Sequence, residues 1–290
     1  MKKTKGILIS YLKNKIGNWI SVNPNIISNQ DTINILNENK YSLSRFGDGE
    51  FNIIWGNDIG FQCYNESLAN RLKYILKKHN KKILIGIPDS FENLDKFEDE
   101  PKKFWEDYMA TNKNKIIKLL NMEKMYCDSF ITRFYLPYKY KYKSSERILQ
   151  IKKIWQGRKI VFVEGSLTRM GIGNDLFDNV ANIRRILVPV TNAFSLYNDI
   201  LNECLNIDKD YLFILSIGPT ASVLSYDLSE YGYQALDLGH IDLQYEYYLR
   251  KCCEKIKIIG KYNNEIDNGD KVEMINDEDY SNQIIKRIGC

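Results

Sequence analysis

Two carboxylates beside glycines are the first residues in this sequence whose types and spacing could do chemistry. Asp48 and Glu50 lie in the segment Arg45–Glu50, Arg-Phe-Gly-Asp-Gly-Glu, which directly follows a β-rich run. In an extended segment, a spacing of two residues points both side chains to one side. Two such oxygen ligands suit Mg²⁺ or Mn²⁺ shared with a substrate phosphate. The alternative is a turn in which Asp48 caps a helix through residues 51–55.

A glycine-rich run after another strand could bind phosphate. The segment Val163–Asp175 contains three glycines, namely Gly165, Gly171 and Gly173. Glycines let backbone amides approach a phosphate, and Arg169 would add positive charge. The run departs from the dinucleotide fingerprint because Leu176 occupies the third glycine position, which argues against a dehydrogenase. The alternative is a glycine-rich connection whose arginine forms only a salt bridge.

Two further strand-to-helix junctions carry polar groups. Gly218, Pro219 and Thr220 predict a helix N-terminus that could bind an anion, or simply a well-capped junction. After the last predicted strand comes His240, and Asp242 and Glu246 follow on one helix face because they are four residues apart. Glu246 could act as a general base. Alternatively, Asp242 caps the helix and His240 is structural.

The elements that must position these residues alternate between strand and helix. The predicted strands are Ser42–Phe46, Lys82–Ile87, Ser129–Phe134, Lys159–Val163, Arg185–Val190, Tyr211–Ile217 and Gln234–Leu238. The predicted helices are Ser67–Lys78, Lys102–Leu120, Ser145–Trp155, Phe194–Asn206, Thr220–Tyr231 and Asp242–Lys255. Several strands are almost entirely apolar, as expected when both faces are covered. The pattern predicts an α/β fold with a mostly parallel sheet, helices on both faces and sites beyond the carboxyl ends of the strands.

Composition excludes several classes of protein. The 290 residues include 41 Lys and Arg against 37 Asp and Glu, a net charge of +4 that is too balanced for a dedicated nucleic-acid binder. Six cysteines without a C-x-x-C pair, together with two histidines, argue against a zinc site and favour reduced thiols in the cytoplasm. No apolar run reaches the length of a membrane span.

The chain divides into three parts by composition. Residues 1–25 predict a basic amphipathic helix, which would suit an anionic membrane surface or packing on its own protein. Residues 26–258 are expected to form the main α/β domain, and residues 259–290 a polar, acidic appendage outside the core or partly disordered. Within the domain, the stretch Arg133–Lys143 interleaves basic and aromatic residues, so a non-enzymatic nucleotide- or RNA-binding module is the alternative function.

Five motifs occur in order along the chain: Arg45–Glu50, Val163–Asp175, Asn192–Phe194, Gly218–Ala221 and Gly239–Asp242. Together they resemble the GT-D-fold bacterial glycosyltransferases, first catalogued as domain of unknown function 1792. The resemblance covers roughly residues 30–255. It implies a Rossmann-like α/β domain that transfers a sugar from a UDP-sugar donor with the help of a divalent metal.

The resemblance also implies roles for individual residues. Asp48 and Glu50 match the family's D-x-E motif, which predicts Mn²⁺ or Mg²⁺ as the cofactor. Arg169 is expected to act on the leaving diphosphate, and Glu246 or His240 to deprotonate the acceptor hydroxyl. Asp242 is a further candidate for this base. The predicted donor-binding residues are Arg45, Gly47, Gly165, Gly171, Gly173, Asn192, Gly218, Pro219, Thr220 and Asp242.

The partners expected from the resemblance are a UDP-sugar and a glycan acceptor carried by a lipid or a protein. Glucose is the first sugar to consider, and the product would be a surface polysaccharide or a glycoprotein glycan. No nucleic-acid partner is expected. The basic helix in residues 1–24 would place the protein at the inner face of the membrane.

Overall fold

The computed structural model describes residues 23–78 and 82–290 of the chain. The helix predicted near the N-terminus falls almost entirely on residues outside this range. Among the described residues, none of the helices combines the length and the hydropathy needed to cross a membrane.

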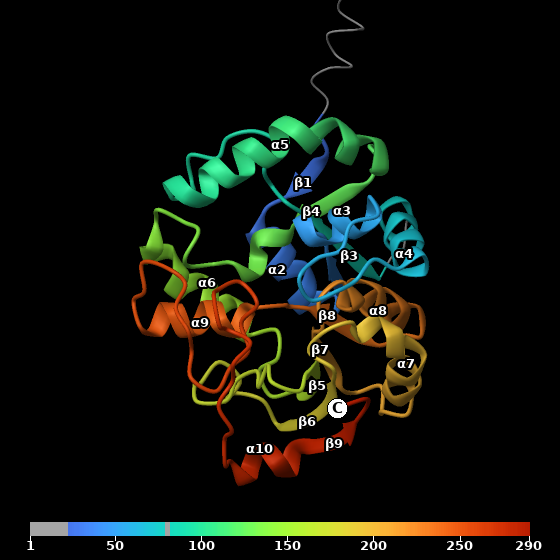
Figure 1. The fold of residues 1–290 in the computed structure, drawn as a ribbon, viewed down its shortest axis with the longest axis vertical. Helices are drawn as coiled ribbons and strands as arrows, with labels where there is room; N and C mark the ends of the chain where they lie inside the picture. Colours follow the sequence, from blue (N-terminus) through green and yellow to red (C-terminus); the bar gives the residue numbers. More distant parts are fainter. Residues whose placement is uncertain (1–22, 79–81) are drawn as a thin grey trace, which may run out of the picture.

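All strands of the described chain form a single parallel sheet, as predicted (Figure 1). The strand order is β1-β4-β3-β2-β8-β7-β5-β6-β9. The bounds are β1 Asn25–Ile27, β2 Ser42–Arg45, β3 Ile83–Ile87, β4 Met125–Asp128, β5 Lys159–Gly165, β6 Asn182–Val188, β7 Leu212–Ser216, β8 Gln234–Asp237 and β9 Ile284–Arg287.

Helices cover both faces of this sheet, because successive residues along the strands point to opposite faces and are apolar on both. In β5, Ile160 and Phe162 pack with helices on one face of the sheet, whereas Val161 and Val163 pack with helices on the other face. The helices are α2 Asn29–Glu38, α3 Asp48–Ile54, α4 Glu66–Lys77, α5 Asp99–Leu119, α6 Ser144–Lys152, α7 Tyr197–Leu205, α8 Pro219–Glu230, α9 Ile241–Leu249 and α10 Glu278–Gln283. Short 3₁₀ helices are η1 Ser129–Thr132, η2 Lys141–Lys143 and η3 Ala193–Leu196.

The structure differs from the predicted fold in three respects. The strand predicted at Ser129–Phe134 is wrong, because β4 ends at Asp128, whose side chain accepts a hydrogen bond from the Phe130 amide at 2.9 Å and starts η1. The strands β1 and β9 were not predicted. Residues 259–290, expected to lie outside the core, instead supply α10 and β9, which pairs with β6 at the edge of the sheet (Figure 1, red).

The direction of the chain connections changes where β2 and β8 lie side by side. The chain leaves β2 toward β3 on one side of this boundary, and after β8 it continues to β9 at the far opposite edge. In open parallel sheets, ligands bind in the crevice outside the carboxyl ends of strands whose connections diverge in this way.

Candidate functional site

Arg45, at the carboxyl end of β2, binds the carboxyl end of the neighbouring strand β8. Its Nε donates to the Asp237 carbonyl at 2.6 Å, its Nη2 to Asp237 Oδ1 at 3.0 Å, and its Nη1 to Thr132 Oγ1 at 2.9 Å. A Cβ at Gly239, where φ is +48°, would lie 2.3 Å from Arg45 Nη2. The arginine predicted to bind the donor therefore joins β2 to β8 through two guanidinium nitrogens and to η1 through the third.

Asp48 and Glu50 lie in the first turn of α3, just beyond the carboxyl end of β2. The expectation that they share one side of an extended segment is wrong, because in a helix a spacing of two residues separates the side-chain directions. The predicted cap at Asp48 is also wrong. The helix is capped at Gly47, whose amide donates to Glu50 Oε2 at 2.7 Å. Because Glu50 folds back toward this end of the helix, the two carboxylates still share its N-terminus.

The electrostatic environment of these two carboxyls is unusual. Burial, reinforced by the negative charge of Asp237, raises the pKa of Glu50 to about 7. Burial also raises the pKa of Asp48, although the positive charge of Arg133 opposes the rise. Groups with perturbed pKa values in a crevice are typical of functional sites.

Asp48 and Glu50 suit a cation that is shared with a substrate. Both offer carboxylate oxygens, which Mg²⁺ and Mn²⁺ prefer, and Glu50 Oε2 is already engaged by the Gly47 amide. In the described part of the chain, no group of three or more His, Cys, Asp or Glu side chains is placed to hold a metal ion. A cation here would need further ligands from a substrate or water, as Mg²⁺ commonly does.

Glu265, a residue that sequence reasoning missed, binds three basic side chains next to Asp48. Its carboxylate pairs with both terminal nitrogens of Arg133, one of them at 3.0 Å. His240 Nδ1 lies 2.9 Å from its Oε1, and Lys255 Nζ lies 3.0 Å from its Oε2. Burial acts to raise the pKa of Glu265, but Arg133 and His240 hold it well below its usual range. No pattern in the sequence marks a glutamate in a polar tail for this position.

The predicted base Glu246 lies in a separate, enclosed cluster. Asn174 Nδ2 donates to Asp242 Oδ1 at 2.8 Å and to Glu246 Oε1 at 2.6 Å, and Lys261 forms ion pairs with both carboxylates. The side chains of Asp242, Glu246 and Lys261 are at most 4% exposed. Burial acts to raise the pKa of Glu246, but Lys261 and Asn174 lower it overall.

Arg169 and the Gly171 amide of the glycine-rich run bind other parts of the protein instead of lining an open anion site. Arg169 is 4% exposed, and its Nη1 donates to the carbonyls of Gly260 and Glu273, at 2.7 Å each. The Gly171 amide donates to Asp242 Oδ1 at 3.1 Å. The prediction that Arg169 supplies charge to a phosphate does not agree with this burial, and among the described residues it forms no salt bridge either. Arg169 instead anchors the C-terminal segment.

The glycines of this run have different surroundings. Gly165 ends β5, where a Cβ would lie 3.2 Å from the Cα of Val190. Gly171 and Gly173 both have left-handed φ, +77° and +78°, which favours glycine. They line a cavity of about 280 Å³, together with Met170, Ile172, Asn174, Phe177, Asp178, Ile183, Arg185 and Gln283.

The predicted anion site at the start of α8 is covered by a loop. The Phe61 ring packs directly against Gly218, whose φ is +58°. A Cβ at this position would lie only 2.6 Å from the ring. Asn192 holds the same loop, since its amide donates to the Phe61 carbonyl at 2.9 Å. Pro219 occupies the first helical turn, and the buried Thr220 hydroxyl has no hydrogen-bond partner among the described residues.

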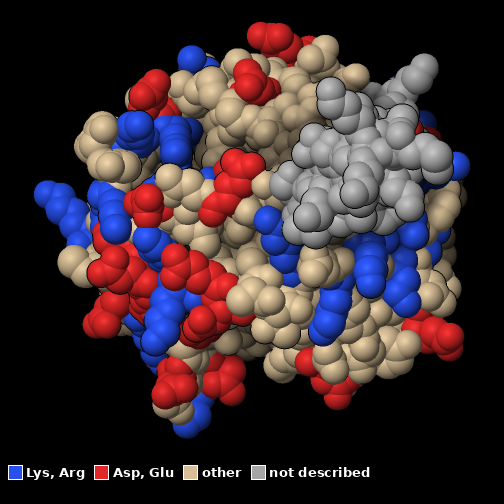
Figure 2. Space-filling view, turned by 90° about the horizontal axis from the view of Figure 1, so that it is seen from above, with Lys and Arg blue, Asp and Glu red and all other residues tan. Residues whose placement is uncertain are grey.

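The basic and aromatic stretch does not form a continuous cationic surface. Arg133 turns inward to Glu265, and Lys139 and Lys141 pair with acidic residues at the start of α5. Tyr140 and Tyr142 are exposed. On the face shown in Figure 2, acidic and basic side chains are intermixed on the left, whereas basic side chains gather on the right.

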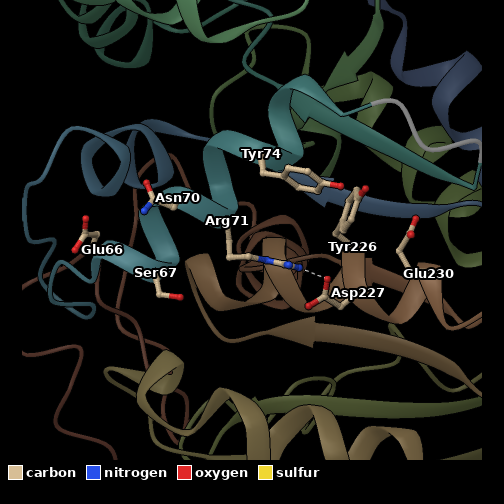
Figure 3. Close-up of a pocket in the computed structure, with 8 residues that line it drawn as sticks. All are labelled: Glu66, Ser67, Asn70, Arg71, Tyr74, Tyr226, Asp227 and Glu230. Carbon is tan, nitrogen blue, oxygen red and sulfur yellow. Dashed lines mark hydrogen bonds and ion pairs between the residues drawn. The ribbon is translucent and has the colours of Figure 1, made fainter.

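A groove of about 650 Å³ lies between α4 and α8, away from the residues predicted from sequence. In Figure 3, Arg71 reaches across it to Asp227, and Tyr74 faces Tyr226. The remaining lining residues are Glu66, Ser67, Asn70 and Glu230. None of the carboxylates predicted to bind metal takes part.

Comparison with known proteins identifies relatives across most of the chain. The model of the family described as glycosyltransferase GT-D fold matches residues 43–266, a range that includes Glu265. A solved structure of domain of unknown function 1792, described as having a distinct glycosyltransferase fold, is 35% identical with a TM-score of 0.87, covering 92% of this chain and 96% of that chain. A glycosyltransferase of the same domain type from Streptococcus sanguinis is 31% identical with a TM-score of 0.88, covering 92% and 100%.

Two curated relatives are longer proteins. Glycosyltransferase GlyD from Streptococcus pneumoniae is 34% identical over 259 residues, which is 89% of this chain and 32% of the relative. Probable glycosyl transferase Gly from Streptococcus gordonii is 32% identical over 264 residues, 91% of this chain and 39% of the relative. The chain thus spans between about a third and two fifths of the length of these relatives.

Proposed function

Because this chain belongs to the glycosyltransferase family with the GT-D fold, as its motifs predicted, we propose that it transfers a hexose from a UDP-sugar to a glycan acceptor. Glucose is the first sugar to test. The acceptor we propose is a growing glycan on a lipid or protein, in the synthesis of a bacterial surface polysaccharide or glycoprotein.

One observation supports this proposal more than any other. The carboxylates of Asp48 and Glu50 lie just beyond the carboxyl end of β2, and the positive charge of Arg133 acts on Asp48, where it opposes the rise of the pKa that burial causes. A nucleoside diphosphate is recognised by this combination of carboxylates for a shared cation and a guanidinium for phosphate oxygens. When bound, Mn²⁺ or Mg²⁺ would supply positive charge to the departing diphosphate.

The structure changes our choice of general base. A base must reach the acceptor hydroxyl, and the side chains of Glu246 and Asp242 are 2% and 4% exposed. His240 is 22% exposed, and its Nδ1 faces Glu265, which leaves Nε2 to face a substrate. We therefore assign the removal of the acceptor proton to His240 in place of Glu246.

The proposal is tested by calorimetry with UDP, in the presence of Mn²⁺ and in the presence of chelator. The test variant is Asp48→Asn/Glu50→Gln, in which glutamine retains the ability to cap α3. The control is Asp210→Asn, which removes a carboxylate of an exposed ion pair just before β7, at the amino ends of the strands and so at the opposite end from Asp48 and Glu50. We expect metal-dependent UDP binding in the wild type and the control but not in the double variant. Absence of UDP binding in the wild type, or binding that ignores the metal, would overturn the proposal.

A further inference from the structure

The segment after α9 places the carboxylate of Glu265 among three basic side chains, Arg133, His240 and Lys255. Glu265 lies in a tight loop closed by hydrogen bonds between the Asn263 amide and the Gly269 carbonyl at 2.9 Å and between the Gly269 amide and the Ile266 carbonyl at 3.3 Å. Asn263 Oδ1 also accepts from the Glu265 amide at 3.0 Å. The loop therefore presents the Glu265 side chain in a defined direction, although no helix or strand supports it.

The groups that receive Glu265 are those that would receive a phosphate. Arg133 presents two nitrogens, the arrangement with which arginine binds carboxylate and phosphate alike. Lys255 adds a second permanent charge at 3.0 Å, and His240 a third contact at 2.9 Å. One carboxylate has at most one negative charge to offer to these groups, whereas a diphosphate has two or more.

This position is open to a ligand from solution. The side chains of Arg133 and Glu265 are 28% and 21% exposed, and Lys255 is 47% exposed. By contrast, the ion pairs of Lys261 with Asp242 and Glu246, a few residues earlier in the same segment, are almost completely buried. The segment is thus anchored at Lys261, while its Glu265 contact can be exchanged.

We propose that Arg133 and Lys255, with His240 beside them, form the binding site for the diphosphate of the donor, and that Glu265 occupies this site until the donor displaces it. The proposal rests on the function proposed above. Glu265 and the donor diphosphate are both negatively charged and use the same basic side chains, so they compete for this site. Displacement would also release Nδ1 of His240 from Glu265, which couples donor binding to the state of the proposed base.

The test measures the affinity of UDP and of pyrophosphate by calorimetry for the wild type and for Glu265→Gln. Glutamine keeps the size of the side chain and removes the competing charge. We expect both ligands to bind Glu265→Gln at least about tenfold more tightly, because a negative charge next to the bound anion is lost. The matched control is Glu273→Gln, which removes a carboxylate of the same segment that pairs with Lys257 instead, and its affinities should equal those of the wild type.

The opposite charge change completes the test. Arg133→Gln should weaken pyrophosphate binding by about tenfold or more. Unchanged or weaker binding by folded Glu265→Gln would overturn the proposal and make Glu265 a support for Arg133 instead of a competitor. Failure of UDP to bind the wild type, with pyrophosphate still bound more tightly by Glu265→Gln, would reject the UDP-sugar donor and keep the anion site.

Discussion

The carboxylate of Asp237 accepts hydrogen bonds from both the backbone amide and the guanidinium of Arg45, at 3.2 and 3.0 Å. This pair lies where the two halves of the sheet meet, and the ladder between β2 and β8 has a single paired position, Leu43 with Leu236. The ion pair therefore adds side-chain hydrogen bonds where backbone pairing is sparse. The negative charge of Asp237 also acts on Glu50 and helps to raise the pKa of that carboxyl.

Arg45→Met is expected to destabilise the protein by about 3–5 kcal/mol, because the Asp237 side chain, 6% exposed, would keep a buried charge without its partner. Lys159→Met is the control. It breaks the exposed ion pair with Asp210 and should lower the free energy of unfolding far less than Arg45→Met does, because solvent screens exposed charges. Urea unfolding at neutral pH measures both free energies. Equal losses would show that the Arg45 pair contributes no more than a surface ion pair.

The glycine-rich run offers a matched pair of substitutions. Gly173→Ala should destabilise by about 1–2 kcal/mol, because only its left-handed φ opposes a side chain. Gly171→Ala should cost about 1–3 kcal/mol more, because its Cβ would lie 2.9 Å from the buried Phe177 ring, which packs on Trp155 and Phe162. Denaturant unfolding of the two variants checks the order. If Gly171→Ala lost no more than Gly173→Ala, the Phe177 ring would have to move freely.

Arg169 is expected to act as an anchor for the C-terminal segment. Arg169→Met removes the hydrogen bonds to the carbonyls of Gly260 and Glu273, so amide hydrogen exchange should accelerate in residues 258–275. Lys257→Met, which breaks a half-exposed ion pair in the same segment, should leave exchange nearly unchanged. Exchange that is equally fast in both variants would argue against anchoring by Arg169.

Stability should depend on pH through Asp128. Burial raises the pKa of this carboxyl from 3.8 to about 6, so the folded protein binds its proton more tightly than the unfolded chain does. Its contribution is therefore fully present below about pH 4 and is lost as the pH rises through about 6, a change of up to about 3 kcal/mol.

Asp128→Asn removes this titration while keeping an oxygen that can accept from the Phe130 amide. The free energy of unfolding of wild type minus variant, measured by urea at a series of pH values between about 4 and about 7, should fall as the pH rises. A difference that stays constant across this range would show that Asp128 titrates normally in the folded protein.

The sequence alone determined the fold class and the end of the sheet at which the motifs lie. The apolar runs at Lys159–Val163 and Tyr211–Ile217 are typical of strands covered on both faces, and their alternation with helices indicated a parallel sheet, which the structure confirms. Motifs that follow strands were therefore expected at the carboxyl ends, where Arg45 and His240 indeed lie. Strand β1 has only three residues, too few to show a pattern, and β9, Ile-Ile-Lys-Arg, lies in a polar segment that gave no strand signal.

Only the tertiary structure decided what each side chain contacts. Arg133 and Glu265 are separated by 132 positions, and Arg169 reaches carbonyls 91 and 104 positions away. Periodicity and capping rules describe interactions among residues a few positions apart, so they assign an element but not a distant partner. The direction of a charged side chain depends on which opposite charges the folded chain brings within about 4 Å, and that is a property of the whole packing.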